Sequence, residues 1–151
     1  MMSDSAEFSF SLEQQDDYAF LIRFDHDIPP LLVDEPAPLG KGAGPNPSRL
    51  LASSVANCLA ASLLFALRKF KNDPGKITAT VTGRTTRNEK GRLRVGGVTV
   101  DIRLGETAAN LQHLDRVLEQ FEDFCVVTQS VRQGFPVDIT VHDGVGQLLK
   151  G

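Results

Sequence analysis

The sequence predicts an α+β fold whose strands form antiparallel sheet. Short segments of alternating apolar and polar residues lie on both sides of one long apolar segment, and such alternation is typical of half-buried strands. The predicted helices and strands are also grouped along the chain rather than alternating one for one. Because no repeat, low-complexity segment or linker divides the sequence, we expect a single domain over residues 1–151.

Three strands are expected in the first part of the chain. A polar QQDD turn separates two segments with an apolar side chain at every second position: Phe8, Phe10 and Leu12, then Tyr18, Phe20, Ile22 and Phe24. The segment LLVDE, residues 31–35, follows two prolines and predicts a short third strand. A loop rich in glycine and proline then ends this sheet.

The long apolar segment predicts a helix. Asn46 is a suitable N-cap, and Pro47 suits the first helical position because an N–H would have no partner there. The apolar pattern continues to about Lys71. Two neighbouring stripes of this helix carry apolar or small residues, so we expect both faces to be buried and Cys58 to point into packed protein.

The second half of the sequence predicts a hairpin, two helices and a strand. Alternation at residues 77–81 and 98–104, around an NEKG turn at 88–91, indicates a long hairpin. Thr107 is expected to cap a helix whose apolar face carries Leu111, Leu114, Val117, Leu118 and Phe121. The segment VVTQSVRQ indicates a short helix that ends at Gly134. Alternating residues then predict a last strand: Val137, Ile139 and Val141.

Composition and charge favour an ordinary globular protein. The net charge of -3 gives no general attraction to nucleic acid, and we interpret the basic residues between positions 84 and 94 as a solvated hairpin tip. The N-terminus lacks the basic start and apolar core of a signal peptide. Serine and asparagine interrupt the apolar run at residues 50–67, which argues against a membrane span. We therefore expect a cytoplasmic protein without nucleic-acid or membrane partners.

The motifs for metals and cofactors are incomplete. The histidines are scattered without metal-ligand spacing: His26, His113 and His142. The loop LGKGAGPNPS lacks both the lysine followed by serine or threonine of a phosphate loop and the third glycine of a dinucleotide fingerprint. No serine lies in a nucleophile-elbow motif. We expect neither a bound metal nor a cofactor.

The two cysteines are the strongest candidates for chemistry. Free buried cysteines are common and often inert, so composition alone favours Cys58 as a packing residue over a catalytic one. Cys125 follows a possible cap, Asp123, and is expected in the first turn of a short helix, where N–H dipoles lower a thiol pKa. Local sequence therefore favours Cys125 as the readily ionised thiol.

The segments around both cysteines carry a family resemblance. GPNPSRLLASSVANCLAASL has a glycine-rich loop, an NP helix start and a cysteine eleven residues after Pro47. FCVVTQSVRQGFPVDITV combines a second cysteine, a short helix and a final strand. Both segments, and the order of elements over nearly the whole chain, resemble the OsmC/Ohr family of osmotically inducible and organic hydroperoxide resistance proteins.

The resemblance implies a two-thiol peroxidase. It implies an OsmC-like intertwined homodimer with antiparallel sheets around two central helices and an active site at the subunit interface. Cys58 would attack an organic hydroperoxide and become a sulfenic acid, and Cys125 would condense with it to a disulfide that an external dithiol reduces. This chemistry, part of a stress response in the family, requires neither metal nor cofactor.

The sequence departs from the family at the residues that activate Cys58. The resemblance assigns that task to an arginine from the early segment and a glutamate beside the NP helix start, where this chain has Ser48. The stretch in which many members carry the arginine reads LVDEPAPLGKG, with Lys41 as its basic residue. Arg23 and Arg49 are the candidate cations, although both positions also suit solvated charges. The candidate acids are Asp34 and Glu35.

Three functions therefore stay open on the sequence alone. The first is a thiol-dependent reductase of organic hydroperoxides that uses Cys58, Cys125 and one of the two arginines. The second is a non-enzymatic OsmC-like protein that binds a small apolar or electrophilic ligand in an interface pocket, and the missing glutamate favours it. The third is a thiol sensor, which requires a regulated partner.

Overall fold

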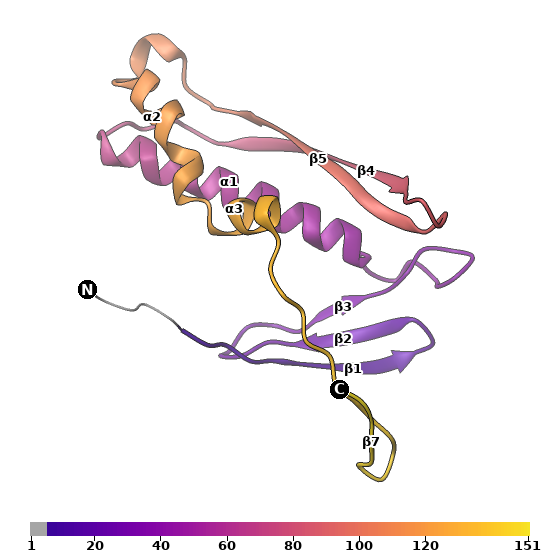
Figure 1. The fold of residues 1–151 in the computed structure, drawn as a ribbon. Helices are drawn as coiled ribbons and strands as arrows, with labels where there is room; N and C mark the ends of the chain where they lie inside the picture. The colour runs from indigo at the N-terminus through magenta and orange to yellow at the C-terminus, as the bar shows by residue number, and fades with distance from the viewer. Residues whose placement is uncertain (1–5) are drawn as a thin grey trace. The chain divides into compact units, whose positions relative to one another are not determined.

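The computed structural model describes residues 6–151 and shows a mixed α/β fold (Figure 1). The elements of this part of the chain are β1 (Ser11–Asp16), β2 (Ala19–Arg23), β3 (Leu31–Val33), α1 (Pro47–Lys69), β4 (Thr78–Arg87), β5 (Leu93–Arg103), η1 (Ala108–Asn110), α2 (Leu114–Gln120), η2 (Phe121–Phe124), α3 (Val126–Gln133), β6 (Val141–His142) and β7 (Leu148–Lys150), where η denotes a 3-10 helix. The chain divides into two compact units. One comprises residues up to 56 and 79–101, the other residues 57–78 and 102–151.

The first unit contains the three-stranded antiparallel sheet β1-β2-β3. Phe20 of β2 lies opposite Val33 of β3, and the side chains of Ala19, Ile22 and Val33 are buried. The predicted third strand is confirmed. The predicted turn lies two residues later than expected, at residues 17–18, because Asp17 adopts a left-handed conformation with φ of 55°.

The first strand begins later than its alternation predicted. β1 starts at Ser11, and Phe8 and Phe10 precede it outside the sheet. Their rings stack on one another with centroids 6.3 Å apart, and Phe10 also packs against Phe24 at 5.2 Å. Aromatic stacking, not strand pairing, therefore accounts for the apolar pattern at these positions.

Helix α1 begins where the sequence indicated. The Asn46 side chain accepts a hydrogen bond from the N–H of Arg49 at 3.0 Å, which is the N-cap interaction, and Pro47 is the first helical residue. The helix ends at Lys69, two residues before the predicted end, because Lys71 is left-handed with φ of 62°. The N–H of Asn72 then bonds the carbonyl of Leu67 and closes the helix.

Helix α1 is long and apolar enough to span a membrane by length and composition. The core helix of a soluble protein satisfies the same criterion. In the second unit α1 supplies Leu63, Ala66 and Leu67 to a core that also contains Val117 of α2. Partly buried hydrophobic residues surround this cluster: Phe70, Ile102, Leu104, Leu114 and Phe121. Because Leu67 and Val117 are fully buried, this core fixes α2 against the second half of α1.

Strands β4 and β5 form the predicted hairpin. The Asn88 carboxamide oxygen accepts the N–H groups of Lys90 and Arg92 at 3.0 and 2.9 Å and so organises the NEKG turn. Arg84 donates to the hydroxyl of Thr99 on the neighbouring strand at 2.8 Å. The predicted hairpin and its turn are thus confirmed.

The helix predicted to start at Thr107 is wrong in its first part. Residues 108–110 form the 3-10 helix η1, and α2 starts only at Leu114. The side chain of Asn72 bonds the N–H and the carbonyl of Gln112 at 2.7 and 2.9 Å, and His113 is left-handed with φ of 54°. These tertiary bonds hold residue 112 between the two helices, so local propensity does not decide the boundary.

The predicted last strand is also wrong for most of its length. Residues 134–140 form no strand, and β6 contains only Val141 and His142. Val137 and Ile139 are 72% and 60% exposed. Val141 pairs with Lys150 of β7, whereas residues 134–140 pair with no strand in the described part of the chain, although their pattern is that of a strand.

The Asn72 bonds provide a test of the fold. We expect Asn72→Ala to lower the free energy of unfolding by about 1–3 kcal/mol, because it removes two partly buried hydrogen bonds between the buried Asn72 side chain and the backbone of Gln112. Asn88→Ala removes two bonds from an exposed turn and is expected to cost less. Urea unfolding at one protein concentration measures both. Equal losses would contradict the importance assigned to Asn72.

Candidate active site

Both cysteines belong to the second unit. Cys58 lies in the middle of α1 and is half-buried, whereas the side chain of Cys125 is fully buried. No disulfide joins them in this structure. A residue in the middle of a helix gains nothing from that helix's own N–H groups, because each already bonds a carbonyl four residues earlier. Any hydrogen bond from backbone N–H groups to Cys58 must therefore come from another element.

That element is α3. Cys125 is its N-cap residue, with extended φ and ψ of -85° and 94°, and makes no capping bond with its own side chain. The next N–H groups of an α-helix lack partners inside the helix. Here hydrogen bonding by the N–H groups of Val127 and Thr128 contributes to a lowered pKa of the Cys58 thiol. The Cys58 sulfur thus takes the place that an N-cap side chain usually has at the second and third residues of a helix.

The surroundings of Cys58 lower the pKa of its thiol. Burial is the largest single influence and raises the pKa. Interactions with the Cys125 side chain, the Val127 N–H, the Ser62 hydroxyl and the Thr128 N–H act in the other direction and together outweigh burial. Since the thiolate is the reactive form of cysteine, these four interactions increase the fraction of reactive Cys58 at neutral pH.

The structure gives Cys58 a lowered thiol pKa. The sequence argument connected the start of α3 with thiol ionisation, and N–H groups at this helix start contribute to the lowered pKa of Cys58. Asp123 does not cap α3, since it belongs to η2. One signal in the sequence could have revealed this arrangement. Helix α3 starts without Ser, Thr, Asp or Asn at its N-cap, so its free N–H groups require an acceptor from elsewhere.

Cys125 has its own hydrogen-bonding partner. Its thiol donates to Oγ1 of Thr128 at 2.9 Å, and Thr128 is buried. Its backbone N–H bonds the carbonyl of Glu122 at 3.1 Å, and that carbonyl also accepts from the Gln129 side chain. The Glu122 carboxylate in turn pairs with Arg132 at 2.7 Å. These bonds fix the backbone around Cys125 and the first turn of α3.

An aromatic pair lies beside Cys125 in sequence. Phe124 packs edge-on against Phe65 of α1, with ring centroids 5.3 Å apart. The ammonium group of Lys69 lies 5.2 Å from the Phe124 ring centroid, within cation–π range. Phe65 and Phe124 stay 57% and 40% exposed. Phe65 and Phe124 therefore form an exposed apolar surface, and Phe124 immediately precedes Cys125 in the sequence.

The structure does not bring Arg49 to Cys58 within one chain. Nine residues separate them on α1, which corresponds to about 13 Å along the axis and to opposite sides of the helix. Arg23 is exposed at the end of β2 in the first unit, opposite Ser11. Among residues 6–151, the groups that bond the Cys58 sulfur carry no formal positive charge.

The candidate acid Asp34 has a structural role. Its buried carboxylate accepts the N–H groups of Glu35, Lys41 and Ala43 at 2.8, 3.2 and 3.1 Å. These bonds, that from Ala43 foremost, lower the pKa of Asp34. Asp34 therefore organises the loop that leads toward α1. Lys41 pairs with Asp16 at 2.7 Å.

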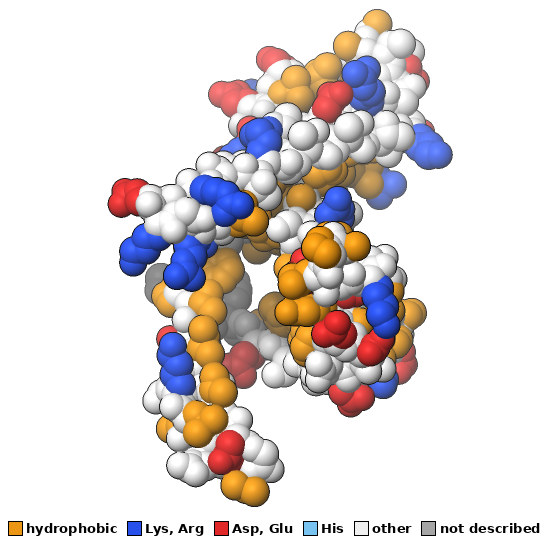
Figure 2. Space-filling view, turned by 90° about the vertical axis from the view of Figure 1, so that its right-hand side faces the viewer, with side chains coloured by type: hydrophobic (Ala, Val, Ile, Leu, Met, Phe, Trp, Pro, Cys, Tyr) orange, Lys and Arg blue, Asp and Glu red, His pale blue; other side chains and the backbone are white. Residues whose placement is uncertain are grey.

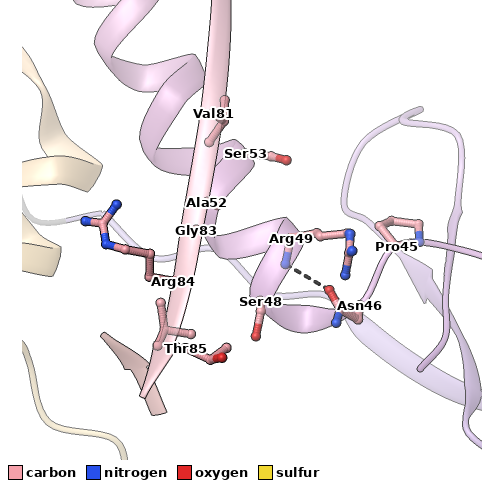
Figure 3. A pocket seen from close by; sticks show the side chains of 11 residues that line it. Pro45, Asn46, Ser48, Arg49, Ala52, Ser53, Val81, Gly83, Arg84 and Thr85 are labelled. Carbon is pink, nitrogen blue, oxygen red and sulfur yellow. Dashed lines mark hydrogen bonds between the residues drawn. The ribbon is translucent and has the colours of Figure 1, made fainter. Parts of the chain in front are cut away.

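A second feature lies in the first unit. A cavity of about 610 Å³ opens between the first turns of α1 and the β4–β5 hairpin (Figure 3). Arg49 and Ser48, the residue at the family's glutamate position, are among its lining residues. On the hairpin side Gly83 contributes no side chain, and a Cβ there would meet nothing within 4 Å. The cavity is thus wide where β4 passes α1.

The fold and the two neighbouring thiols define a class of protein. Antiparallel sheets accompany three α-helices in the described residues, and a cysteine of the long helix meets a second cysteine at the start of a short one. Residues 40–140 match the family model described as OsmC-like protein. The chain belongs to the OsmC family, which confirms the resemblance noted in the sequence. No curated protein matches the chain.

Solved structures share this fold. An OsmC-like protein of unknown function from Vibrio cholerae has a TM-score of 0.69 and 18% identity, covering 83% of this chain and 94% of that one. An organic hydroperoxide resistance protein from Legionella pneumophila has a TM-score of 0.65 and 15% identity, and the match covers 85% of this chain and 92% of that one. An organic hydroperoxide resistance protein from Bacillus subtilis has a TM-score of 0.59 and 18% identity, and the match covers 83% of this chain and 91% of that one. At these identities the comparison establishes the fold, in which α1 is a core helix.

The donors around Cys58 predict its pH dependence. We expect site-resolved alkylation of Cys58 by iodoacetamide to follow a pKa below that of an ordinary cysteine, so the thiolate fraction at neutral pH is enlarged. Ser62→Ala is expected to raise this pKa and slow alkylation at neutral pH, because one donor is lost. Ser54→Ala is the control, since that hydroxyl bonds the Leu50 carbonyl of the same helix. Identical profiles for both variants would contradict the role of Ser62.

Proposed function

We propose that this protein is a thiol-dependent peroxidase that reduces organic hydroperoxides. The observation that carries the proposal is the meeting of Cys58 and Cys125 at the start of α3, where hydrogen bonds favour the Cys58 thiolate. Membership of the OsmC family and the fold shared with organic hydroperoxide resistance proteins support it. We further propose that residues 1–151 act as one domain in the cytoplasm.

The reaction follows from the chemistry of two thiols. The Cys58 thiolate attacks a peroxide oxygen, the O–O bond breaks, and the alkoxide leaves as the alcohol after taking a proton. Cys58 is then a sulfenic acid. The Cys125 sulfur attacks the Cys58 sulfur, an S–S bond forms, and the hydroxyl departs as water. An external dithiol reduces this disulfide by two exchange steps and becomes oxidised itself.

A homodimer is part of the proposal. Figure 2 shows hydrophobic side chains on the surface of the protein. Large hydrophobic side chains that are exposed in the second unit include Phe65, Phe135, Val137 and Ile139. Residues 134–140, which contain Val137 and Ile139, have the pattern of a strand but pair with no strand among residues 6–151. A second copy supplies both the missing strand partner and cover for the apolar side chains. We propose that it also supplies Arg49 or Arg23 to Cys58.

Oxidation by a hydroperoxide tests the peroxidase function. We expect cumene hydroperoxide to convert the reduced protein to an intramolecular Cys58–Cys125 disulfide far faster than it oxidises free cysteine. Cys125→Ser should stop at a Cys58 sulfenic acid that dimedone traps, and Cys58→Ser should form neither product. Mass spectrometry of the quenched protein distinguishes these species. A wild-type protein that stays reduced would contradict the proposal.

The proposed role of an arginine in peroxide oxidation is tested separately. We expect Arg49→Ala to lower the second-order rate constant for peroxide oxidation by about tenfold, the effect of losing one charge-assisted hydrogen bond. Arg87→Ala is the matched control, because that guanidinium bonds the Gly91 carbonyl in the hairpin. Stopped-flow oxidation monitored by quenched mass spectrometry gives both constants. If neither Arg49→Ala nor Arg23→Ala slows oxidation, the partner's arginines have no part in it.

Binding of a small ligand is the second candidate function, and the cavity beside α1 favours it. The cavity combines apolar residues such as Ala52, Val81 and Val95 with the cation Arg49. Under this hypothesis 8-anilinonaphthalene-1-sulfonate, an apolar anion, binds with a fluorescence increase that Gly83→Leu abolishes by filling open space. Ligand binding without peroxide oxidation would establish this function in place of the first.

A further inference from the structure

Thr128 contacts both sulfur atoms of the candidate site. Its backbone N–H donates to the sulfur of Cys58, and its side-chain Oγ1 accepts the thiol hydrogen of Cys125 at 2.9 Å. Ser62, the other buried hydroxyl at the site, donates to Cys58. The backbone N–H of Thr128 therefore interacts with the proposed peroxidatic thiol of Cys58, and its Oγ1 interacts with the proposed resolving thiol of Cys125.

The position of Thr128 is fixed by the start of α3. It is the third residue of the helix, and Cys125 is the N-cap three residues earlier. The carbonyl of Cys125 accepts the N–H of Gln129 at 3.1 Å, which closes the first turn around the cysteine. Because the side chain of Thr128 is only 5% exposed, its hydroxyl has little contact with bulk water.

Burial creates a proton-transfer problem for the resolving step. The Cys125 side chain has no exposed surface, so its thiol proton has no direct route to solvent. The attack on the sulfenic acid releases that proton, and the departing hydroxide needs one. The Glu122 carboxylate, a nearby base in sequence, is paired with Arg132. The hydroxyl that already accepts the Cys125 proton is that of Thr128.

We propose that Thr128 is the proton relay of the disulfide-forming step. As the Cys125 sulfur attacks the Cys58 sulfur, the thiol proton passes to Oγ1 of Thr128, and the threonine's own hydroxyl proton passes to the departing hydroxide. The products are the Cys58–Cys125 disulfide and water. Thr128 is again a neutral hydroxyl, which now carries the proton that came from Cys125. This inference rests on the proposed peroxidase function and assigns a catalytic residue to its second step.

Substitution of Thr128 separates the relay from the first chemical step. Thr128→Val keeps the shape of the side chain and the backbone N–H to Cys58 but removes the hydroxyl. We expect sulfenic acid formation with cumene hydroperoxide to proceed at the wild-type rate, and disulfide formation to slow by about tenfold or more, since general acid–base groups contribute at least this much. Thr128→Ser retains the hydroxyl and is expected to restore fast closure.

Rapid quenching with dimedone followed by mass spectrometry resolves the two steps. Accumulation of dimedone-labelled Cys58 in Thr128→Val, but not in Thr128→Ser, supports the relay. Wild-type closure in Thr128→Val overturns it. Equal slowing in both variants also overturns it, because that result reports packing around residue 128 rather than a hydroxyl.

A disulfide substrate keeps this test independent of the peroxidase function. Oxidised glutathione forms a mixed disulfide with Cys58, and attack by Cys125 then expels a glutathione thiolate, which takes the proton. Release of the second glutathione is expected to be slow in Thr128→Val and fast in wild type and Thr128→Ser. A wild-type protein inert to hydroperoxide contradicts the proposed function, while unchanged glutathione release in Thr128→Val contradicts the relay.

Discussion

The free N–H groups at the start of α3 are the constraint on which the candidate site depends. Helix α1 places Cys58 at a position where its own backbone offers no donor, and burial of the sulfur opposes ionisation. Interactions with the Cys125 side chain, and then with the Val127 N–H, the Ser62 hydroxyl and the Thr128 N–H, together reverse that balance. One interaction thus satisfies two needs: the helix start gains an acceptor, and the thiolate gains donors.

The rest of the second unit serves to hold α3 at Cys58. The contact of Leu67 with the fully buried Val117 fixes α2 against α1, and η2 follows α2 directly. The bonds of Asn72 to Gln112 determine where α2 begins. Because Glu122 binds the Cys125 N–H by its carbonyl and Arg132 by its carboxylate, η2 and α3 are joined on both sides of the cysteine. Packing and backbone bonding therefore determine the chemistry of the sulfur.

The features that the sequence predicted correctly are those that neighbouring residues determine. Asn46 caps α1, Asn88 organises the hairpin turn, and Gly134 ends α3. The start of α2 depended on Asn72, forty residues before Gln112, and no local pattern contains that information. Similarly, both cysteines were recognised as candidates, but the direction of the α3 N–H groups toward Cys58 is a tertiary contact. The family resemblance implied Cys58 as the nucleophile that we propose, where local electrostatics had favoured Cys125.

Ser48 stands where the family resemblance implies a glutamate, so in our proposal the activation of Cys58 relies more on hydrogen bonds within the chain. The most direct test of this account is the pKa of Cys58 after one N–H donor of α3 is removed. The titration is monitored through the Cβ chemical shift of labelled cysteine. Val127→Pro deletes a donor at a position in the first helical turn, where proline is best tolerated, and Val126→Pro deletes an N–H that does not bond the sulfur. The account predicts a raised Cys58 pKa in Val127→Pro alone. An unchanged pKa in that variant, with α3 intact, would contradict it.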